Sequence, residues 1–252
     1  ASILFNYQLA RLITKNVYKK FLLILGIFLN LSLLCYFKYS NFFIETFNSF
    51  VNDSFNSLSI ILPIGISFFT FQQIAFLIDN YNKKNEEKNI LHYTLFVSFF
   101  PQLISGPIVN HNEIKHQFKD LKNKLLEVWK NLSIGTVIIT IGLFKKVILA
   151  EKMGVWSDQS FSFVQAGGVL TFLEAWIGIL CFTFQIYFDF SAYSDIALGL
   201  GLLFGLKLPV NFLSPYKASS IIEFWRLWHI TLSRFLKNYL YFPLGGSKVG
   251  KY

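Results

Sequence analysis

A nine-residue stretch of this sequence places ionisable and hydroxyl side chains between two strongly apolar runs. Residues 187–195 (YFDFSAYSD) contain Asp189 and Asp195 together with Ser191 and Tyr193. These groups could line a buried polar cavity. They could equally form a short turn between two helices, with an Asp or Ser side chain as helix cap. Because Asp189 and Asp195 are six residues apart, too far for one helix face, we expect the chain to break or turn between them.

A second stretch, residues 219–241, predicts a helix that carries a histidine. At 100° per residue, one stripe of this helix holds Arg226, His229, Ser233 and Lys237, and Trp225 and Trp228 cover much of the remaining surface. An imidazole that is shielded from water stays neutral and can act as a base. The alternative is an interfacial helix in which the tryptophans and arginine anchor the chain at the membrane surface and His229 is structural.

The third polar stretch, residues 101–107 (PQLISGP), offers Gln102, Ser105 and exposed backbone groups within the apolar segment 90–109. Lysines flank this segment on both sides. Since cytoplasmic loops are enriched in Lys and Arg, both flanks are expected in the cytoplasm, which one crossing cannot achieve. We therefore expect a re-entrant or broken element, turned at 101–102 and again at 106–107 and covered by protein or by a water-filled cavity. A proline-kinked spanning helix is the alternative.

The composition identifies the environment of these groups. Of the 252 residues 54% are hydrophobic and only 15% are charged, and the mean hydropathy is +0.48. A soluble domain usually has about 25% charged residues. The sequence predicts an all-α, polytopic membrane protein. The net charge of +9 comes from lysines that separate apolar segments, without the basic, aromatic-rich face of a nucleic-acid-binding protein.

The apolar runs predict where helices cross the membrane. Residues 132–150 include Lys145 and Lys146, and we expect this segment not to cross completely. The spacing of Gly199, Gly201 and Gly205 is typical of close helix packing rather than of nucleotide binding. His111 and His116 lack metal-site spacing, and no metal is expected. The remaining predicted segments are spans over 21–37, 58–78, 169–188 and 196–206, the last one short, and an amphipathic surface helix over 112–131 with Ile114, Phe118, Leu121, Leu125 and Trp129 on one face.

The sequence is expected to form one transmembrane domain over residues 1–252, incomplete at both ends. It begins at Ala1, and its single methionine is Met153.

Several motifs, in order along the chain, resemble those of the bacterial membrane-bound O-acyltransferases. The nearest branch is the alginate O-acetylation type, with relatives in peptidoglycan O-acetylation and teichoic-acid D-alanylation. The resemblance covers most of residues 58–246 and rests on 62–72 (LPIGISFFTFQ), 101–108 (PQLISGPI), 187–195 (YFDFSAYSD), 223–233 (EFWRLWHITLS) and 239–246 (YLYFPLGG).

The resemblance implies a many-helix fold with oblique and re-entrant helices around a tunnel, in the bacterial inner membrane. It implies transfer of an acyl group, expected to be acetyl, from a cytoplasmic thioester donor (acetyl-CoA or an acyl carrier) toward hydroxyls of an extracytoplasmic polysaccharide, completed by an extracytoplasmic acetyltransferase partner. No tightly bound cofactor is implied. His229 matches the family's motif histidine; a second histidine is expected beyond Tyr252.

From these considerations His229 is the predicted catalytic residue. A transporter or channel is the alternative function, since broken helices and buried charges are also typical of that class. The predicted substrate-binding residues are Asp189, Ser191, Tyr193, Asp195, Trp225, Arg226, Trp228, Gln102 and Ser105.

Overall fold

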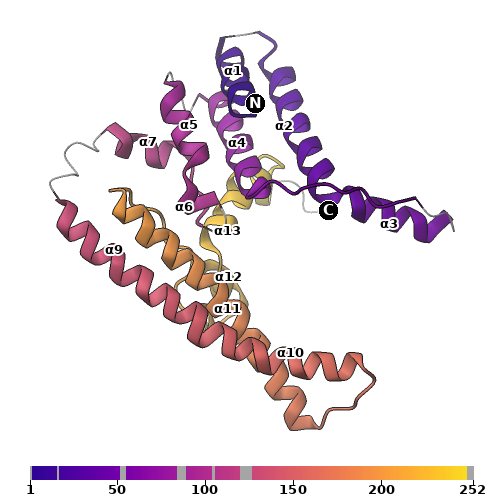
Figure 1. Ribbon diagram of the computed structural model, residues 1–252. Helices are drawn as coiled ribbons and strands as arrows, with labels where there is room; N and C mark the ends of the chain where they lie inside the picture. The colour runs from indigo at the N-terminus through magenta and orange to yellow at the C-terminus, as the bar shows by residue number, and fades with distance from the viewer. Residues whose placement is uncertain are drawn as a thin grey trace. The chain divides into compact units, whose positions relative to one another are not determined.

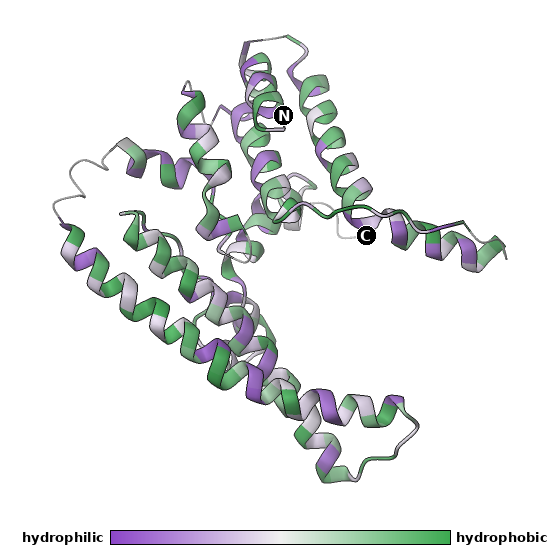
Figure 2. Cartoon of the chain, in the orientation of Figure 1, coloured by the Kyte–Doolittle hydropathy of each residue, from purple (hydrophilic) through white to green (hydrophobic). Residues whose placement is uncertain are grey.

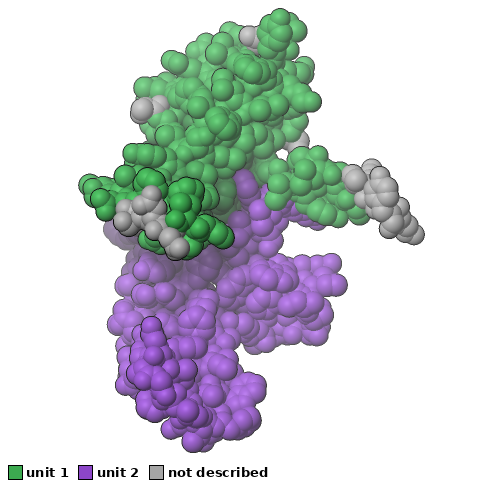
Figure 3. All heavy atoms as spheres, turned by 90° about the vertical axis from the view of Figure 1, so that its right-hand side faces the viewer, with its two compact units in different colours: residues 1–104, 108–119, 239–252 green, residues 105–107, 120–238 purple. Residues whose placement is uncertain are grey.

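The computed structural model describes residues 2–15, 17–51, 55–83, 89–103, 106–119 and 127–248. Every regular element within these ranges is a helix, and none is a strand. The described parts fall into two compact units (Figure 3). Unit 1 comprises Ala1–Ile104, Ile108–Lys119 and Tyr239–Tyr252, and unit 2 comprises Ser105–Pro107 and Asp120–Asn238. The all-α fold predicted from the composition is confirmed.

Unit 1 is built on three helices that pack against one another: α1 (Ser2–Lys15), α2 (Lys19–Leu34) and α4 (Ile66–Tyr81) (Figure 1). Amide side chains join them in the core. Asn6 Nδ2 donates to Asn30 Oδ1 at 3.1 Å and to Gln73 Oε1 at 2.7 Å. Because a buried amide is costly without a partner, these bonds fix how the three helices face one another.

The first predicted span, 21–37, is longer in the structure. Helix α2 continues through a π-helical segment, η1 (Cys35–Tyr39), into α3 (Ser40–Val51) without a loop. The second prediction, 58–78, began too early: residues 55–65 are not α-helical, and α4 starts at Ile66. Gly65 precedes it with φ +71°, and a Cβ there would lie 2.5 Å from the Leu103 carbonyl oxygen. Only glycine satisfies both conditions, so the helix cannot extend upstream.

The broken element predicted over 90–109 is confirmed as a helix break. Helix α5 (Ile90–Ser98) ends at Phe99, whose ψ of 97° is extended, and the short α6 (Phe100–Leu103) follows. The first break precedes Pro101, whereas we expected it at 101–102; residues 106–110 are again not helical. Whether the segment re-enters the membrane stays a prediction.

The surface helix predicted over 112–131 is shorter. Helix α7 (His111–Lys119) buries Ile114 and Phe118 as expected, residues 120–126 lie outside the described ranges, and Trp129 belongs to the next helix.

Unit 2 is built on a helical hairpin (Figure 1). One arm is a 38-residue run of α9 (Val128–Leu143), the π-helical η3 (Phe144–Ala150) and α10 (Glu151–Gln165). The other arm is α11 (Phe172–Leu203), which packs along all three. Thr171 and Glu174 begin α11 with a reciprocal capping box, in which each side chain accepts a hydrogen bond from the other residue's backbone N–H.

Three helical runs among the described residues are long and apolar enough to cross a membrane: Lys19–Val51, Val128–Gln165 and Phe172–Leu203. Hydrophobic residues predominate along α2, α9 and α11, whereas α10 is more mixed (Figure 2). Residues 132–150 lie within the second of these runs, and whether they cross completely stays a prediction. Lys145 and Lys146, the reason for that prediction, are both paired with carboxylates of α11, which lowers the cost of placing them in lipid.

The predicted break between Asp189 and Asp195 is wrong. Helix α11 runs unbroken from Phe172 to Leu203, so the separate spans predicted over 169–188 and 196–206 are one helix, and Ser194 and Asp195 are interior residues rather than caps.

The region after α11 is the least regular part of unit 2. It contains a short 3-10 helix, η4 (Pro215–Lys217), and two α-helices, α12 (Ile221–Leu227) and α13 (Ile230–Leu236). The single helix predicted over 219–241 is thus interrupted at 228–229. The elements η5 (Lys237–Tyr241, π-helical) and η6 (Gly246–Lys248, 3-10) complete the described chain.

Small residues bring α9 and α11 into backbone contact, as predicted for Gly199. A Cβ on Gly135 would lie 2.8 Å from the Gly199 carbonyl oxygen, and a Cβ on Gly199 would lie 2.7 Å from that of Gly135. Without a hydrophobic force between helices in lipid, such close approach is a main source of association.

We therefore expect Gly135→Leu to lower the free energy of unfolding by about 1 to 3 kcal/mol, because a larger side chain must separate the two backbones. Thermal unfolding in detergent would measure the change. Val137→Leu, which enlarges a side chain 58% exposed on the same helix, is the control and should be near neutral. Equal effects of the two variants would contradict the packing role of Gly135.

Candidate active site

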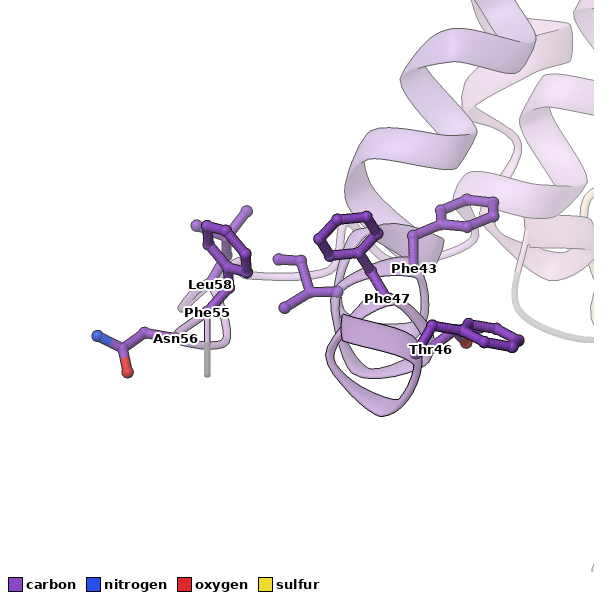
Figure 4. Close-up of a pocket in the computed structure, with 8 residues that line it drawn as sticks. Phe43, Thr46, Phe47, Phe55, Asn56 and Leu58 are labelled. Atoms are coloured by element: carbon purple, nitrogen blue, oxygen red, sulfur yellow. The ribbon is translucent and has the colours of Figure 1, made fainter. Parts of the chain in front are cut away.

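A groove of about 720 Å³ lies in unit 1 beside α3 (Figure 4). In Figure 4, Phe43 and Phe47 come from the helix, and Phe55 and Leu58 from the extended segment that follows. The lining contains no ionisable side chain and none of the residues predicted to act on substrate. Its full lining is Phe43, Ile44, Thr46, Phe47, Phe50, Phe55, Asn56 and Leu58. This groove can bind an apolar group, but it contains no side chain that could act as a general acid or base.

His229 lies at the break between α12 and α13. Its backbone is left-handed, with φ 43° and ψ 53°. A residue with a side chain rarely adopts this conformation, which costs about 1 to 3 kcal/mol and persists only where the surroundings impose it. Helix α12 ends at Leu227 with Trp228 as its C-cap, and the Ser233 N–H begins the bonding of α13 by donating to the His229 carbonyl at 3.1 Å.

The imidazole of His229, a half-buried residue, packs against two aromatic rings of unit 2. The ring of Phe190 on α11 meets it edge-on at 4.8 Å, and the ring of Phe212 is nearly parallel to it at 6.3 Å. The Nε2 atom is buried and has no hydrogen-bond partner among the described residues. Burial lowers the pKa of His229 from 6.5 to about 4, because desolvation penalises the imidazolium. The side chain is therefore a neutral imidazole at pH 7.

The two tryptophans of the motif have different surroundings. The ring of Trp228 lies 5.1 Å from Phe212 and 5.6 Å from Phe224, inside the aromatic cluster next to His229. Trp225 is 55% exposed, and Arg226 is exposed as well. The predicted stripe that joins Arg226, His229 and Ser233 does not form, because the chain turns at His229.

The two carboxylates of α11 are engaged by consecutive lysines of η3. Lys145 Nζ lies 2.6 Å from Asp195 Oδ2, and Lys146 Nζ lies 2.6 Å from Asp189 Oδ1. Lys146 Nζ also lies 5.4 Å from the centre of the Tyr193 ring. The pairs explain why a helix with two acidic residues remains continuous in an apolar environment. Both pairs are partly exposed, and a contact of Asp189, Tyr193 or Asp195 with substrate stays a prediction.

The remaining predicted residues are Ser191, Gln102 and Ser105, and no hydrogen bond or ring contact links Ser191 to His229 in the described part of the chain. Ser191 is buried and its hydroxyl donates to the Phe188 carbonyl of the same helix at 3.4 Å. Gln102 belongs to unit 1: it is completely buried, Nε2 donates to the Phe96 carbonyl at 2.6 Å, and Oε1 has no partner in the described chain. Ser105 lies outside the described residues.

Sequence reasoning missed Asn211, which is completely buried next to His229. Its Oδ1 accepts from the Thr231 hydroxyl at 3.0 Å and from the Thr231 N–H at 3.3 Å, and its Nδ2 donates to Ser194 Oγ at 3.3 Å. The signal was present in the sequence: a single amide between Val210 and Phe212, which is unfavourable in an apolar setting unless it finds partners. The pairing of Lys145 and Lys146 was missed as well.

Unit 1 contains a second buried imidazole, that of His111. The rings of Phe76 and Phe96 meet it edge-on at 5.4 and 5.2 Å, and burial lowers its pKa to about 3. Over the described ranges, no group of three or more His, Cys, Asp or Glu side chains is arranged to hold a metal ion.

Comparison with known proteins gives one consistent family. The family model for membrane-bound O-acyltransferases (MBOAT) matches residues 16–252. A peptidoglycan O-acetyltransferase of Helicobacter pylori is 49% identical over 98% of this chain and 52% of its own length. A probable alginate O-acetylase of Pseudomonas putida is 40% identical over 91% of the chain and 47% of its own length.

More distant similarity extends to a teichoic acid D-alanyltransferase of Streptococcus thermophilus, 27% identical over 72% of the chain and 44% of its own length. The chain spans about half the length of the curated relatives it matches.

The ion pairs of α11 lead to a stability prediction. Lys146→Met leaves the Asp189 carboxylate without its partner, and we expect a loss of about 2.5 to 3.5 kcal/mol, the cost of a lone charge within a membrane helix. The double variant Lys146→Met, Asp189→Leu should recover most of this loss. The free energy of unfolding in micelles measures both.

Lys152→Met, on an exposed position of α10, is the control. If the double variant is as unstable as Lys146→Met alone, the pairing does not account for the stability of α11.

Proposed function

The chain belongs to the membrane-bound O-acyltransferase family, and on that premise we propose that it forms part of an acetyltransferase. The enzyme moves an acetyl group from a cytoplasmic thioester donor toward hydroxyls of an extracytoplasmic polysaccharide. The names of the relatives support the acetyl group and a polysaccharide acceptor. Peptidoglycan is the first acceptor to test, because the relative that is 49% identical is a peptidoglycan O-acetyltransferase.

One observation carries the proposed chemistry: the Nε2 atom of His229 is buried and has no protein partner among the described residues. A neutral imidazole in this position accepts the proton of an acceptor hydroxyl as the hydroxyl oxygen attacks the thioester carbonyl. The tetrahedral intermediate then expels the thiolate. The imidazolium returns its proton to the sulfur, which leaves His229 neutral and the acetyl group as an ester.

The surroundings of His229 favour transfer to a hydroxyl over hydrolysis. Phe190 and Phe212 place apolar surface beside the imidazole and limit the access of water. Trp228 and its neighbours provide flat faces for the acyl chain or the thioester, whereas Trp225 and Arg226, which are exposed, are positioned to contact a donor at the surface.

The rest of the assembly follows from the same premise. The acyl donor is acetyl-CoA or an acylated carrier, used as a substrate and not as a bound cofactor. A bacterial inner-membrane location places donor and acceptor on opposite sides, and an extracytoplasmic acetyltransferase partner completes the transfer. The three apolar helical runs support a multi-pass placement in lipid.

A transporter is the weaker candidate. It was favoured by charges inside apolar segments, but Asp189 and Asp195 both have lysine partners and are not free to bind a passing ion.

The role of His229 is tested by His229→Ala in the native polypeptide that carries this chain. Removal of a general base is expected to lower acetyl transfer about 10²- to 10⁴-fold. Ester-linked acetate on the peptidoglycan, normalised to the amount of membrane-inserted protein, measures the effect. His116→Ala, at an exposed position of α7, is the matched control and should retain activity. Unchanged acetylation in His229→Ala would reject the catalytic role.

The buried imidazole also predicts the pH dependence. Because its pKa is lowered to about 4, His229 loses its proton at lower pH than an ordinary histidine and remains a base in mild acid. The value of kcat/KM for the thioester donor should therefore be constant from pH 7 down through 6.5 and reach half its maximum near pH 4. A half-maximum at 6.5 or above would show that the base is not a desolvated imidazole.

A further inference from the structure

The left-handed backbone of His229 needs an explanation outside its own helix. Helix α13 begins directly after His229, and its first N–H groups require acceptors. The residue at such a position usually supplies one from its own side chain. His229 does not, since its side chain makes no capping bond.

Asn211 supplies these acceptors from another segment. Its main-chain carbonyl accepts from the Ile230 N–H at 3.0 Å, and its Oδ1 accepts from the Thr231 N–H at 3.3 Å. On the other side of the break, the Leu213 N–H donates to the Leu227 carbonyl at 3.1 Å. The segment around Asn211 therefore holds the chain immediately before and immediately after His229.

The same segment is itself anchored to α11. Asn211 Nδ2 donates to Ser194 Oγ, and Ser194 lies one helical turn from Phe190, whose ring contacts the imidazole. Phe212, the residue after Asn211, has its ring 6.3 Å from the imidazole and 5.0 Å from the ring of Phe190. With two acceptor bonds and one donor bond, the buried amide of Asn211 uses three of its four bonding positions.

We propose that Asn211 is a positioning residue of the acetyltransferase: it caps α13 in place of a side chain at 229 and so holds His229 in its left-handed conformation, with the imidazole packed against Phe190 and Phe212. This inference rests on the proposed role of His229. Because capping is done by Asn211, the imidazole keeps Nε2 available for the substrate. Without Asn211, residue 229 relaxes to an ordinary conformation and the ring moves toward water.

The test is Asn211→Leu in the native polypeptide, which keeps the size of the side chain and removes its hydrogen bonds. We expect kcat for acetyl transfer to fall at least tenfold, with KM for the thioester donor within twofold of the native value. The pH at which kcat/KM falls to half its maximum on the acid side (its acid limb) should rise from about 4 toward 6.5, because the imidazole becomes hydrated. A native kcat with an unshifted acid limb would overturn the proposal.

Two milder variants serve if Asn211→Leu does not accumulate. Asn211→Asp keeps an oxygen acceptor for Thr231 and should retain more activity than Thr231→Val combined with Ser194→Ala, which removes the hydroxyls on both sides of the amide. If Asn211→Asp is no more active than that double variant, the side-chain oxygen of Asn211 does not position His229.

Asn30→Leu is the control for general destabilisation. Asn30 is also a buried amide with bonds to another helix, but it belongs to unit 1. This variant should lower the amount of folded protein and leave the acid limb in place; an equal shift would overturn the specific role of Asn211. The two proposals can be rejected separately. Full acetyl transfer in His229→Ala would reject the role of His229 as base. Loss of acetyl transfer in His229→Ala, together with full activity in the Asn211 variants, would reject only the positioning role of Asn211.

Discussion

A polar side chain inside a membrane-crossing helix is stable only beside a partner, because lipid offers no hydrogen bonds. This constraint helps to determine how the helices pack in both units. In unit 1, Asn6 binds Asn30 and Gln73 and thereby joins three helices. In unit 2, two ion pairs join α11 to η3. Each contact links residues far apart in the sequence, so satisfying the polar groups also selects which helices pack together and which faces meet.

The rotation of α11 about its axis follows from these contacts. Asp189 and Asp195 are directed to the lysines of η3, and Gly199 meets Gly135 of α9. Phe190 and Ser194 then lie on a different face, where they contact His229 and Asn211. The carboxylates that sequence reasoning assigned to substrate thus also orient the helix that supports the candidate base.

The features that could be predicted from sequence are those with a local signal. The long apolar runs predicted the helices. Pro101 predicted a break near residue 101, and the motifs indicated the family. Pairing has no such signal: Asp195 and Lys145 are 50 positions apart, so neither the continuity of α11 nor the ion pairs that join it to η3 could be inferred. The late start of α4 is different, because Pro63 and Gly65 do mark it, and the prediction gave them too little weight.

The break at His229 is the most informative failure, because nothing in residues 223–233 interrupts a helix: there is no proline, glycine or asparagine. A continuous helix would be the unstrained state and would place the imidazole on a polar stripe with Arg226 and Ser233, hydrated and near its ordinary pKa. The left-handed residue costs about 1 to 3 kcal/mol. The bonds from Asn211 and the neighbouring backbone offset that cost, and the result is an imidazole that packs against aromatic rings with its Nε2 atom buried. The strain at His229 has no cause in its own segment and is maintained by the buried amide of Asn211 from another segment. Such an arrangement suits a site in which the base must be kept away from water.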